Sequence, residues 1–439
     1  MFERYFQLSA HGTTVRREVV AGLTTFLTMA YIMFVNPKVL SAAGLDEGAV
    51  FVATCLAVAL TSLMMGLWAK LPVALAPGMG LNAYFAFTVV PQLNYDWQLA
   101  LGCVFLSGIL FVLISVTPAR EWLINALPRN LKLAIAAGIG FFLALIGLND
   151  AGIVTANGTI SLLTAGTLSA PSVLLAAGGF IIIFALASRR VIGAVMIGIV
   201  AVTIAAIAWN VSPPPLTVAS APPPIAPTLF QLHFSSPMAN ATSLIVTGVL
   251  VFLVVDMLDT SGTLMAVAYQ GNLLDEDGKL PNARRALTTD AIGTMIGAVL
   301  GTSPVTAYIE SSAGIQAGGR TGLTAVVVAV LFLLCLFLSP LASAVPEFAT
   351  APALIFVSAL MVKGLKEIDW DDLTEAAPAL LTALAIPFTY SIATGIGIGF
   401  ISYVAIKIVA WRWRDLNWAV VMIALAFVAK IAMDVPATR

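Results

Sequence analysis

Apolar runs of about 18 residues or more recur from one end of the chain to the other, with short polar stretches between them. Each run is long enough for a helix to cross the hydrocarbon core of a bilayer. We therefore expect an all-α polytopic membrane protein with about fourteen transmembrane segments. They are predicted near 18–39, 49–69, 72–91, 98–118, 131–149, 171–188, 191–209, 243–268, 287–301, 303–319, 321–342, 351–363, 373–391 and 394–411. For a last apolar run, Trp418 to Met433, a crossing, a re-entrant and an interfacial placement all stay open.

The positive charge of the loops alternates along the chain. Loops on the side of the N-terminus carry Arg16, Arg17, Lys70, Arg120, Arg129, Lys132, Arg189, Arg190, Lys279, Arg284, Arg285, Lys363, Lys366, Arg412 and Arg414. Apart from Lys38, the opposite loops are nearly free of Lys and Arg, including a Pro-rich stretch over 212–227 that is typical of a stiff exterior linker. Because cytoplasmic loops are enriched in Lys and Arg, we expect a cytoplasmic N-terminus.

Composition narrows the class of protein further. The chain is 60% hydrophobic and 10% charged, with a net charge of −1, so it lacks the basic surface of a nucleic-acid-binding protein. Three cysteines fall inside apolar segments without paired spacing, and there are two histidines. We expect no disulfide, metal site or cofactor.

Two predicted segments, the third and the tenth, do not read as continuous helices. One runs Leu71-Pro-Val-Ala-Leu-Ala-Pro-Gly-Met-Gly-Leu-Asn-Ala-Tyr-Phe85, and the other Gly301-Thr-Ser-Pro-Val-Thr-Ala-Tyr-Ile-Glu-Ser-Ser-Ala-Gly314. Pro and Gly interrupt both, and irregular backbone at membrane depth is tolerated only where protein or a cavity covers it. Broken segments at corresponding positions in two halves of a chain indicate a transporter site between inverted repeats.

Two acids occupy one apolar segment, Asp256 and Asp259. Acids at membrane depth are costly, which marks them as candidates for function. Their i, i+3 spacing places them on one helix face. Burial and mutual repulsion both disfavour the ionised forms, which suits groups that accept a proton near neutral pH. Asp259 is the firmer candidate, and a structural role stays open for Asp256.

The broken segments supply the other candidates for substrate binding. Glu310 precedes Ser311 and Ser312, where a helix start would present free N–H groups beside the carboxylate. The alternative is that Glu310 only caps this helix. Asn82, after Gly80, can donate to and accept from a heterocycle, or it can satisfy frayed backbone.

Further polar and aromatic residues near these segments have a structural interpretation. Tyr84, Phe85 and Phe87 are more typical of core or lipid-facing positions than of a stacking platform. Asp290 is expected at a membrane interface. Arg320 is expected at the cytoplasmic boundary, where it holds a helix C-terminus or extends to the headgroups.

Several long motifs resemble those of the AzgA-like purine permeases, relatives of the uracil and xanthine permeases in the nucleobase–cation symporter group. They are His11-Gly-Thr-Thr-Val-Arg-Arg-Glu-Val-Val-Ala-Gly-Leu-Thr-Thr-Phe, Leu75-Ala-Pro-Gly-Met-Gly-Leu-Asn-Ala-Tyr-Phe, Leu258-Asp-Thr-Ser-Gly-Thr, Thr306-Ala-Tyr-Ile-Glu-Ser-Ser-Ala-Gly and Gly318-Gly-Arg-Thr-Gly-Leu-Thr-Ala. Ser311 stands where the uracil and xanthine branch commonly has Asn, which favours the AzgA-like branch.

The resemblance implies fourteen segments in two inverted seven-segment repeats, with a core domain, a gate domain and short antiparallel strands in segments three and ten. We expect the first repeat over 1–210, the exterior linker over 211–242, the second repeat over 243–411 and a C-terminal apolar segment and tail over 412–439. The family pattern matches Asp259, Glu310, Gly80 and Asn82.

The same resemblance implies a transporter, not an enzyme, in a bacterial inner membrane. It implies import of adenine, guanine or hypoxanthine with a proton, by alternating access, and a possible homodimer. The candidates for proton coupling are Asp259, Asp256 and Glu310.

Two other functions fit parts of the pattern. An anion carrier on the same kind of fold would need positive charge at the midplane, where this chain has acids. An intramembrane aspartyl protease would need acids from two helices and a Gly-x-Gly-Asp motif, which the chain lacks. The chain also lacks a P-loop, so we do not expect an ATP-driven pump.

Overall fold

A computed structural model describes residues 2–93, 95–117, 128–157, 162–215, 217–235, 244–271, 273–274 and 280–434, and these residues are mostly helical. The ends of the predicted linker and tail, 236–242 and 435–439, lie outside the described residues. The first half contains α1 (Phe2–Phe6), α2 (Val15–Met29), α3 (Ile32–Ser41), α4 (Glu47–Met64), η1 (Met65–Ala69), β1 (Leu75–Pro77), α5 (Met79–Ala83), η2 (Tyr84–Val89), α6 (Val90–Gln92), α7 (Trp97–Val116), α9 (Arg129–Asp150), β2 (Val154–Asn157), β3 (Leu162–Ala165), α10 (Pro171–Ser188) and α11 (Ala194–Ala208). The second half contains η3 (Leu244–Leu250), α13 (Val251–Gln270), α14 (Ala283–Leu300), β4 (Val305–Ala307), α15 (Ser311–Gln316), α16 (Gly322–Cys335), η4 (Leu336–Leu338), α17 (Ser339–Ser343), α18 (Glu347–Val362), η5 (Lys363–Glu367), α19 (Leu373–Phe388), α20 (Ile392–Val409), η6 (Trp413–Asp415) and α21 (Trp418–Asp434).

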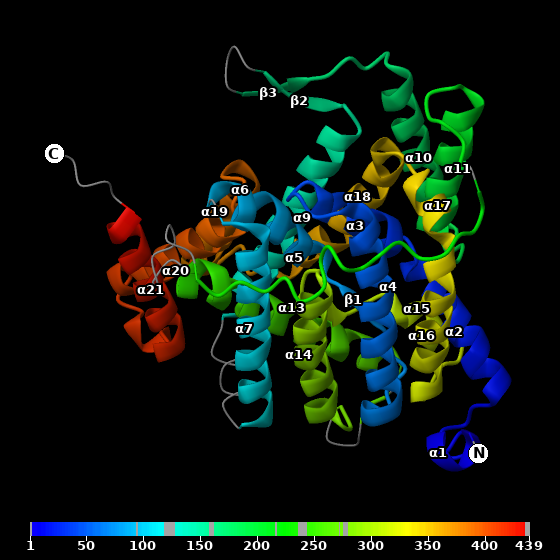
Figure 1. The fold of residues 1–439 in the computed structure, drawn as a ribbon. Coiled ribbons are helices and arrows are strands. Elements are labelled where there is room, and N and C mark those ends of the chain that lie inside the picture. The colour runs from blue at the N-terminus through cyan, green and yellow to red at the C-terminus, as the bar shows by residue number, and fades with distance from the viewer. Residues whose placement is uncertain are drawn as a thin grey trace.

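The helices form two bodies, which correspond to the predicted core and gate domains (Figure 1). In the core body, α2, α3, α4, α7, α14 and α16 pack around the two broken segments and α13. In the gate body, α9, α10, α11, α18, α19 and α20 pack mainly on one another, and α21 packs on α20. Comparatively few contacts join the two bodies. The arrangement is that of two inverted repeats, as the sequence pattern predicted.

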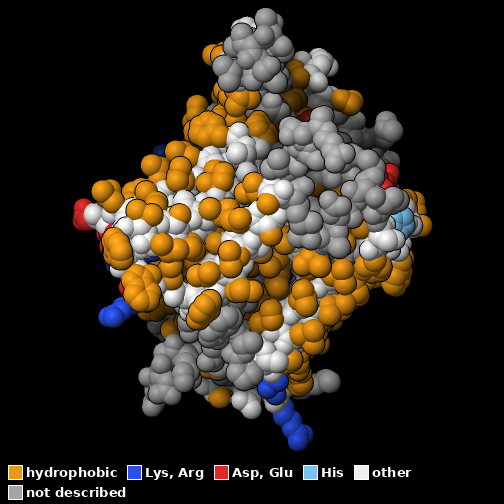
Figure 2. Space-filling view, turned by 90° about the vertical axis from the view of Figure 1, so that its left-hand side faces the viewer, with side chains coloured by type: hydrophobic (Ala, Val, Ile, Leu, Met, Phe, Trp, Pro, Cys, Tyr) orange, Lys and Arg blue, Asp and Glu red, His pale blue; other side chains and the backbone are white. Residues whose placement is uncertain are grey.

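The outer surface suits a bilayer. Among the described residues, nine helices are long and apolar enough to cross a membrane, and shorter apolar helices add to them. On the face shown in Figure 2, hydrophobic side chains cover most of the described surface, and the visible Lys and Arg side chains lie at its margins. The protein is therefore a multi-pass membrane protein.

Local signals explain where several helices begin. Asp46 accepts a hydrogen bond from the Ala49 N–H at 2.8 Å and starts α4, and Ser391 caps α20 in the same way. Asp372 caps α19, and its bonds to Thr374 and to the Arg412 guanidinium hold the pKa of this carboxyl at about 2. The charged cap lies in a loop, where water and Arg412 can stabilise it.

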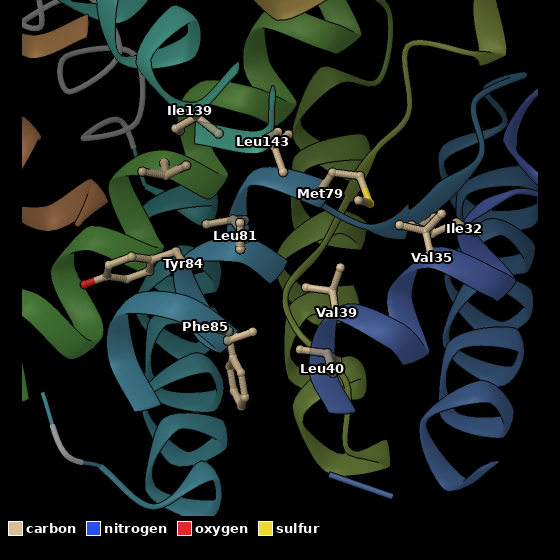
Figure 3. Close-up of a cluster of buried hydrophobic side chains, with 14 of the residues drawn as sticks. Ile32, Val35, Val39, Leu40, Met79, Leu81, Tyr84, Phe85, Ile139 and Leu143 are labelled. Atoms are coloured by element: carbon tan, nitrogen blue, oxygen red, sulfur yellow. The ribbon is translucent and has the colours of Figure 1, made fainter. Parts of the chain in front are cut away.

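The first broken segment lies deep in the interior. Figure 3 shows Met79 and Leu81 between apolar side chains of α3 and α9, whereas the Tyr84 ring points away from α3. Tyr84 and Phe85 are fully buried, and the Tyr84 hydroxyl donates to the backbone carbonyl of Thr247 in η3. These aromatic residues belong to the core, in agreement with the structural interpretation of the sequence.

Two connections outside the bundle have distinct forms. Strands β2 and β3 pair antiparallel between α9 and α10, and the hydrophobic pattern did not predict them because each has only four residues. The Pro-rich linker runs across the core body and is bonded to it: the Ser220 N–H donates to Phe337 O at 3.0 Å, and the Phe230 N–H donates to Val299 O at 2.8 Å.

Two glycines bring α16 and the end of the second segment into backbone contact. A Cβ added at Gly322 would lie 1.9 Å from the Gly66 carbonyl oxygen, and one added at Gly66 would lie 2.4 Å from the Gly322 carbonyl oxygen. Small residues at such crossings let membrane helices approach closely.

We therefore expect Gly322→Val to lower the stability of the folded protein by about 1–3 kcal/mol, the usual cost of overpacking. Thermal unfolding in detergent, followed by fluorescence-detected gel filtration, measures this change. Gly178→Ala is the control, because a Cβ at Gly178 meets nothing within 4 Å. Equal transition temperatures for the two variants would contradict the packing argument.

Candidate functional site

The two broken segments meet at the centre of the core body through a pair of short strands. β1 and β4 are antiparallel, with Leu75 opposite Ala307 and Pro77 opposite Val305. The pairing extends beyond the strands, since the Tyr308 N–H donates to Ala74 O at 3.0 Å and the Gly78 N–H to Pro304 O at 2.9 Å. The prediction that segments three and ten are broken and meet as strands is confirmed.

A short helix follows each strand. α5 begins at Met79 and α15 at Ser311, as predicted for the second one. The first N–H groups of a helix have no partner within it and carry partial positive charge. At α15 these groups are already bonded, since the N–H groups of Ser311, Ser312 and Ala313 donate to the carbonyls of Tyr308, Ile309 and Glu310 in the preceding turn.

Glu310 opens into a cavity of about 790 Å³ between the two bodies. Its Oε1 accepts a hydrogen bond from the Tyr31 hydroxyl at 2.9 Å, and its side chain does not cap α15. Thr28, Tyr31 and Ser312 line the same cavity from the core, opposite Arg190 and other residues of the gate. The Glu310 carboxylate is therefore oriented by a tyrosine and faces open space.

The two serines after Glu310 differ in their surroundings. Ser311 is fully buried and its Oγ accepts from the Ala74 N–H at 3.0 Å, so it fastens α15 to the first broken segment. Ser312 lines the cavity of Glu310, and its hydroxyl has no partner among the described residues.

Asp259 opens into a second cavity, of about 430 Å³. Gly80 and Ser261 line it from the core, and Ile139 and Lys132 line it from the gate. The Asp259 carboxylate interacts with the Thr306 hydroxyl of β4. A Cβ at Gly80 would lie 2.7 Å from Ile139 Cγ2, so glycine here permits close approach of core and gate.

The two predicted substrate acids thus face adjacent cavities in this conformation. Tyr308 interacts electrostatically with both Asp259 and Glu310. Its hydroxyl donates to Pro77 O at 2.7 Å, which fixes the ring against β1. Sequence reasoning missed Tyr308 and Tyr31, although Tyr308 lies two residues before Glu310 in the broken segment.

Asn82 lies behind these cavities and lines neither of them. It is fully buried, and its Oδ1 accepts a hydrogen bond from the Ser303 hydroxyl. Its Nδ2 lies 3.7 Å from Met79 Sδ. In this conformation Asn82 links the first broken segment to the start of the second.

Asp256 and Asp259 point to different neighbours despite their i, i+3 spacing. Asp256 is 1% exposed and its Oδ2 accepts from the Thr294 hydroxyl of α14 at 2.7 Å. Asp256 therefore faces a helix interface, whereas Asp259 faces a cavity.

The expectation of an interfacial Asp290 is wrong. Asp290 is fully buried, and it interacts electrostatically with Asp256 and, more weakly, with Asp259. The physical reason is that α14 begins at Ala283, before the predicted start at 287, so Asp290 lies about two turns inside the helix.

Arg320 holds a helix C-terminus, which is the first of the two roles predicted for it. Its Nη1 donates to Ile315 O and Gly319 O, both at 2.8 Å, at the end of α15. Beside it, the fully buried carboxylate of Glu18 accepts from the Arg320 N–H at 2.8 Å and from the Thr324 hydroxyl at 2.6 Å. Glu18 lies within the first family-like motif, yet nothing in its spacing distinguished it from a surface residue.

Two bodies with acids in the cavities between them, around a pair of broken segments, define a membrane transporter. The chain matches the permease family model over residues 16–398, and it belongs to this family of xanthine and uracil permeases. The adenine permease AdeP of Escherichia coli (strain K12) is 48% identical over 433 residues, which cover 98% of this chain and 96% of AdeP. The guanine/hypoxanthine permease PbuG of Bacillus subtilis (strain 168) is 47% identical over 408 residues, which cover 91% and 92%.

Solved structures share the architecture at much lower identity. The transmembrane domain of the cyanobacterial bicarbonate transporter BicA matches with a TM-score of 0.65 and 17% identity, covering 86% of this chain and 96% of that chain. At this identity the likeness concerns the fold alone.

The lining of the cavities includes Arg190 of the α10–α11 loop and Lys132 in the first turn of α9, and the sequence pattern predicts both on the side of the N-terminus. Cysteines introduced as Ser312→Cys and Thr263→Cys should react with a membrane-impermeant maleimide applied from that side, and not from the other. Labelling of inside-out and right-side-out vesicles measures this access. The native thiols of Cys55, Cys103 and Cys335 are buried and serve as the unreactive background. Labelling from the opposite side only would contradict the direction in which the cavities open.

Proposed function

We propose that the protein is a proton-coupled importer of purine nucleobases, with adenine, hypoxanthine and guanine as candidate substrates. The observation that carries the proposal is that two partly exposed acids, Asp259 and Glu310, line two cavities between the bodies, beside the β1–β4 pair. The names of AdeP and PbuG support a purine as the substrate.

The chemistry of a purine base matches these groups. A purine presents N–H donors and ring or carbonyl acceptors along the edge of a flat ring. The carboxylates accept from N–H groups, and the Ser312 hydroxyl, which has no partner among the described residues, can donate to an acceptor. In the proposed bound state the bodies close on the base, so that Asp259, Glu310, Gly80 and Ser312 meet one substrate, while Ser311 holds α15 against the first broken segment. Asn82 then contributes by holding the first broken segment in place.

The remaining parts of the proposal concern coupling, orientation and assembly. Acids at membrane depth bind protons readily, which supports symport with a proton. The alternation of Lys and Arg between loops supports a cytoplasmic N-terminus in a bacterial inner membrane. Repeats over 1–210 and 243–411, joined by the exterior linker, support alternating access by motion of the gate against the core. A homodimer stays a prediction.

Uptake into proteoliposomes tests the proposal. The wild-type protein should accumulate labelled adenine, hypoxanthine or guanine when the outside is made acidic, and an unlabelled purine should compete. Asp259→Asn and Glu310→Gln should each weaken substrate binding by ~30-fold or more, since a hydrogen bond to a charged group contributes about 2 kcal/mol.

Asp371→Asn is the matched control, because Asp371 is an exposed acid outside both cavities and its change should leave uptake unaltered. Purine uptake that ignores the proton gradient and both site variants would contradict the proposal. Inhibition by sulfate or bicarbonate, and not by purines, would favour an anion carrier instead.

A further inference from the structure

A polar cluster lies buried between α13 and α14, outside both cavities. It contains Asp256 and Thr260 of α13, and Asp290 and Thr294 of α14. In each helix the acid and the threonine are spaced i, i+4 and share one face. The pairs interact crosswise, because the Thr294 hydroxyl donates to Asp256 Oδ2 at 2.7 Å and Thr260 lies beside Asp290.

Most of the oxygens in this cluster are poorly satisfied by hydrogen bonds. Within the described residues, Asp256 Oδ1, both oxygens of Asp290 and Thr260 Oγ1 are buried without a hydrogen bond of good geometry, and the donors that interact with Asp290 are the Thr260 hydroxyl and the Ala307 N–H. Neither acid takes part in an ion pair. An ionised carboxylate buried without partners is very unfavourable, and two of them together are more so. A bound cation therefore stabilises the cluster.

The surrounding elements supply no compensating charge. The nearest further charged group is Asp259, one turn along α13, and it is also an acid. The elements that pack on α13 and α14 are η1, η3, α4, α5, α7, α15, β1 and β4. Their titratable residues are the buried thiols Cys55 and Cys103, together with Glu47, which is paired with Lys38 at the far end of α4.

A proton is the cation that fits best. The described residues contain no group of three or more His, Cys, Asp and Glu side chains able to hold a metal ion. Two carboxylates in low dielectric readily share one proton, since the second ionisation is opposed by the first charge.

We propose that Asp256 and Asp290 together bind the transported proton, while Asp259 and Glu310 bind the base. This inference rests on the proposed function and names the ion site within it. The proton arrives from the cavity of Asp259, whose lining includes the unpaired hydroxyl of Ser261. It adds to one carboxylate of the pair, converts that acid to its neutral form, and leaves as a proton on the other side of the membrane.

The position of the cluster links it to the substrate site. Thr294 also lies 3.3 Å from the Val305 carbonyl of β4, and the next residue, Thr306, interacts with Asp259. Protonation of Asp256 weakens the hydrogen bond that its carboxylate accepts from Thr294. The Thr294 hydroxyl can then donate more strongly to the Val305 carbonyl of β4. Substrate binding and proton binding are thus coupled through one strand.

Proteoliposomes loaded with unlabelled adenine separate substrate exchange from proton coupling. With one proton per substrate, a gradient of ~1 pH unit gives about tenfold accumulation by the wild type. Asp256→Asn and Asp290→Asn should retain adenine exchange and lose this tenfold accumulation, and adenine should no longer move protons detected by an internal pH dye. Asp371→Asn should keep exchange, accumulation and proton movement.

The outcomes distinguish the two proposals. A wild-type protein without purine uptake contradicts the proposed function itself. A wild type that is proton-driven, with Asn variants that are still proton-driven, overturns the inference alone. Folded Asn variants that lose exchange as well as accumulation also overturn it, because the pair would then serve the substrate site.

Thr294→Val provides a test that leaves both acids in place. It removes a donor to ionised Asp256, so the pH of half-maximal driven uptake should move upward while exchange persists. An unchanged pH profile would contradict the inference. Replacing sodium by potassium should leave wild-type uptake unaltered, and a requirement for sodium would overturn the assignment of a proton.

Discussion

The antiparallel pairing of β1 and β4 is the interaction on which the rest of the structure depends. At membrane depth no water is available to satisfy backbone N–H and C=O groups, so a broken helix is tolerable only if another segment pairs with it. Each broken segment supplies the partners that the other needs. Neither half of the chain can form its centre without the other half.

This mutual dependence explains why function gathers at the same place. The breaks bring Asp259 on α13 close to the segment that carries Glu310. The Tyr31 hydroxyl orients the Glu310 carboxylate, and the Tyr308 hydroxyl is bonded to the Pro77 carbonyl of β1. The polar centre is costly for folding, and two of its acids line cavities between the bodies.

Much of this could be predicted from the sequence because the membrane imposes simple rules. Hydrophobic run lengths gave the segments, and Pro and Gly marked both breaks. The motif around Glu310 predicted the start of α15. The fate of single polar side chains depended on distances between segments far apart in the chain. Glu18 could not be recognised as the buried partner of α16 for that reason, whereas Asp290 was placed wrongly because α14 begins earlier than the apolar pattern indicated. Likewise, the spacing of residues along the chain predicts neither the separate cavities of Asp259 and Glu310 nor the hydrogen bond from Ser303 to Asn82.

The linker between the repeats has a mechanical consequence. It leaves the gate body at the end of α11 and is bonded to the core body from Ser220 onward, through Phe337 and then Val299. Any displacement of one body against the other must therefore be absorbed between Trp209 and Ser220. Asn210, with a φ of 56°, and the consecutive prolines 213–215 lie in that stretch. The linker is therefore fixed to the core body at one end, and its stretch next to the gate body is left to adjust.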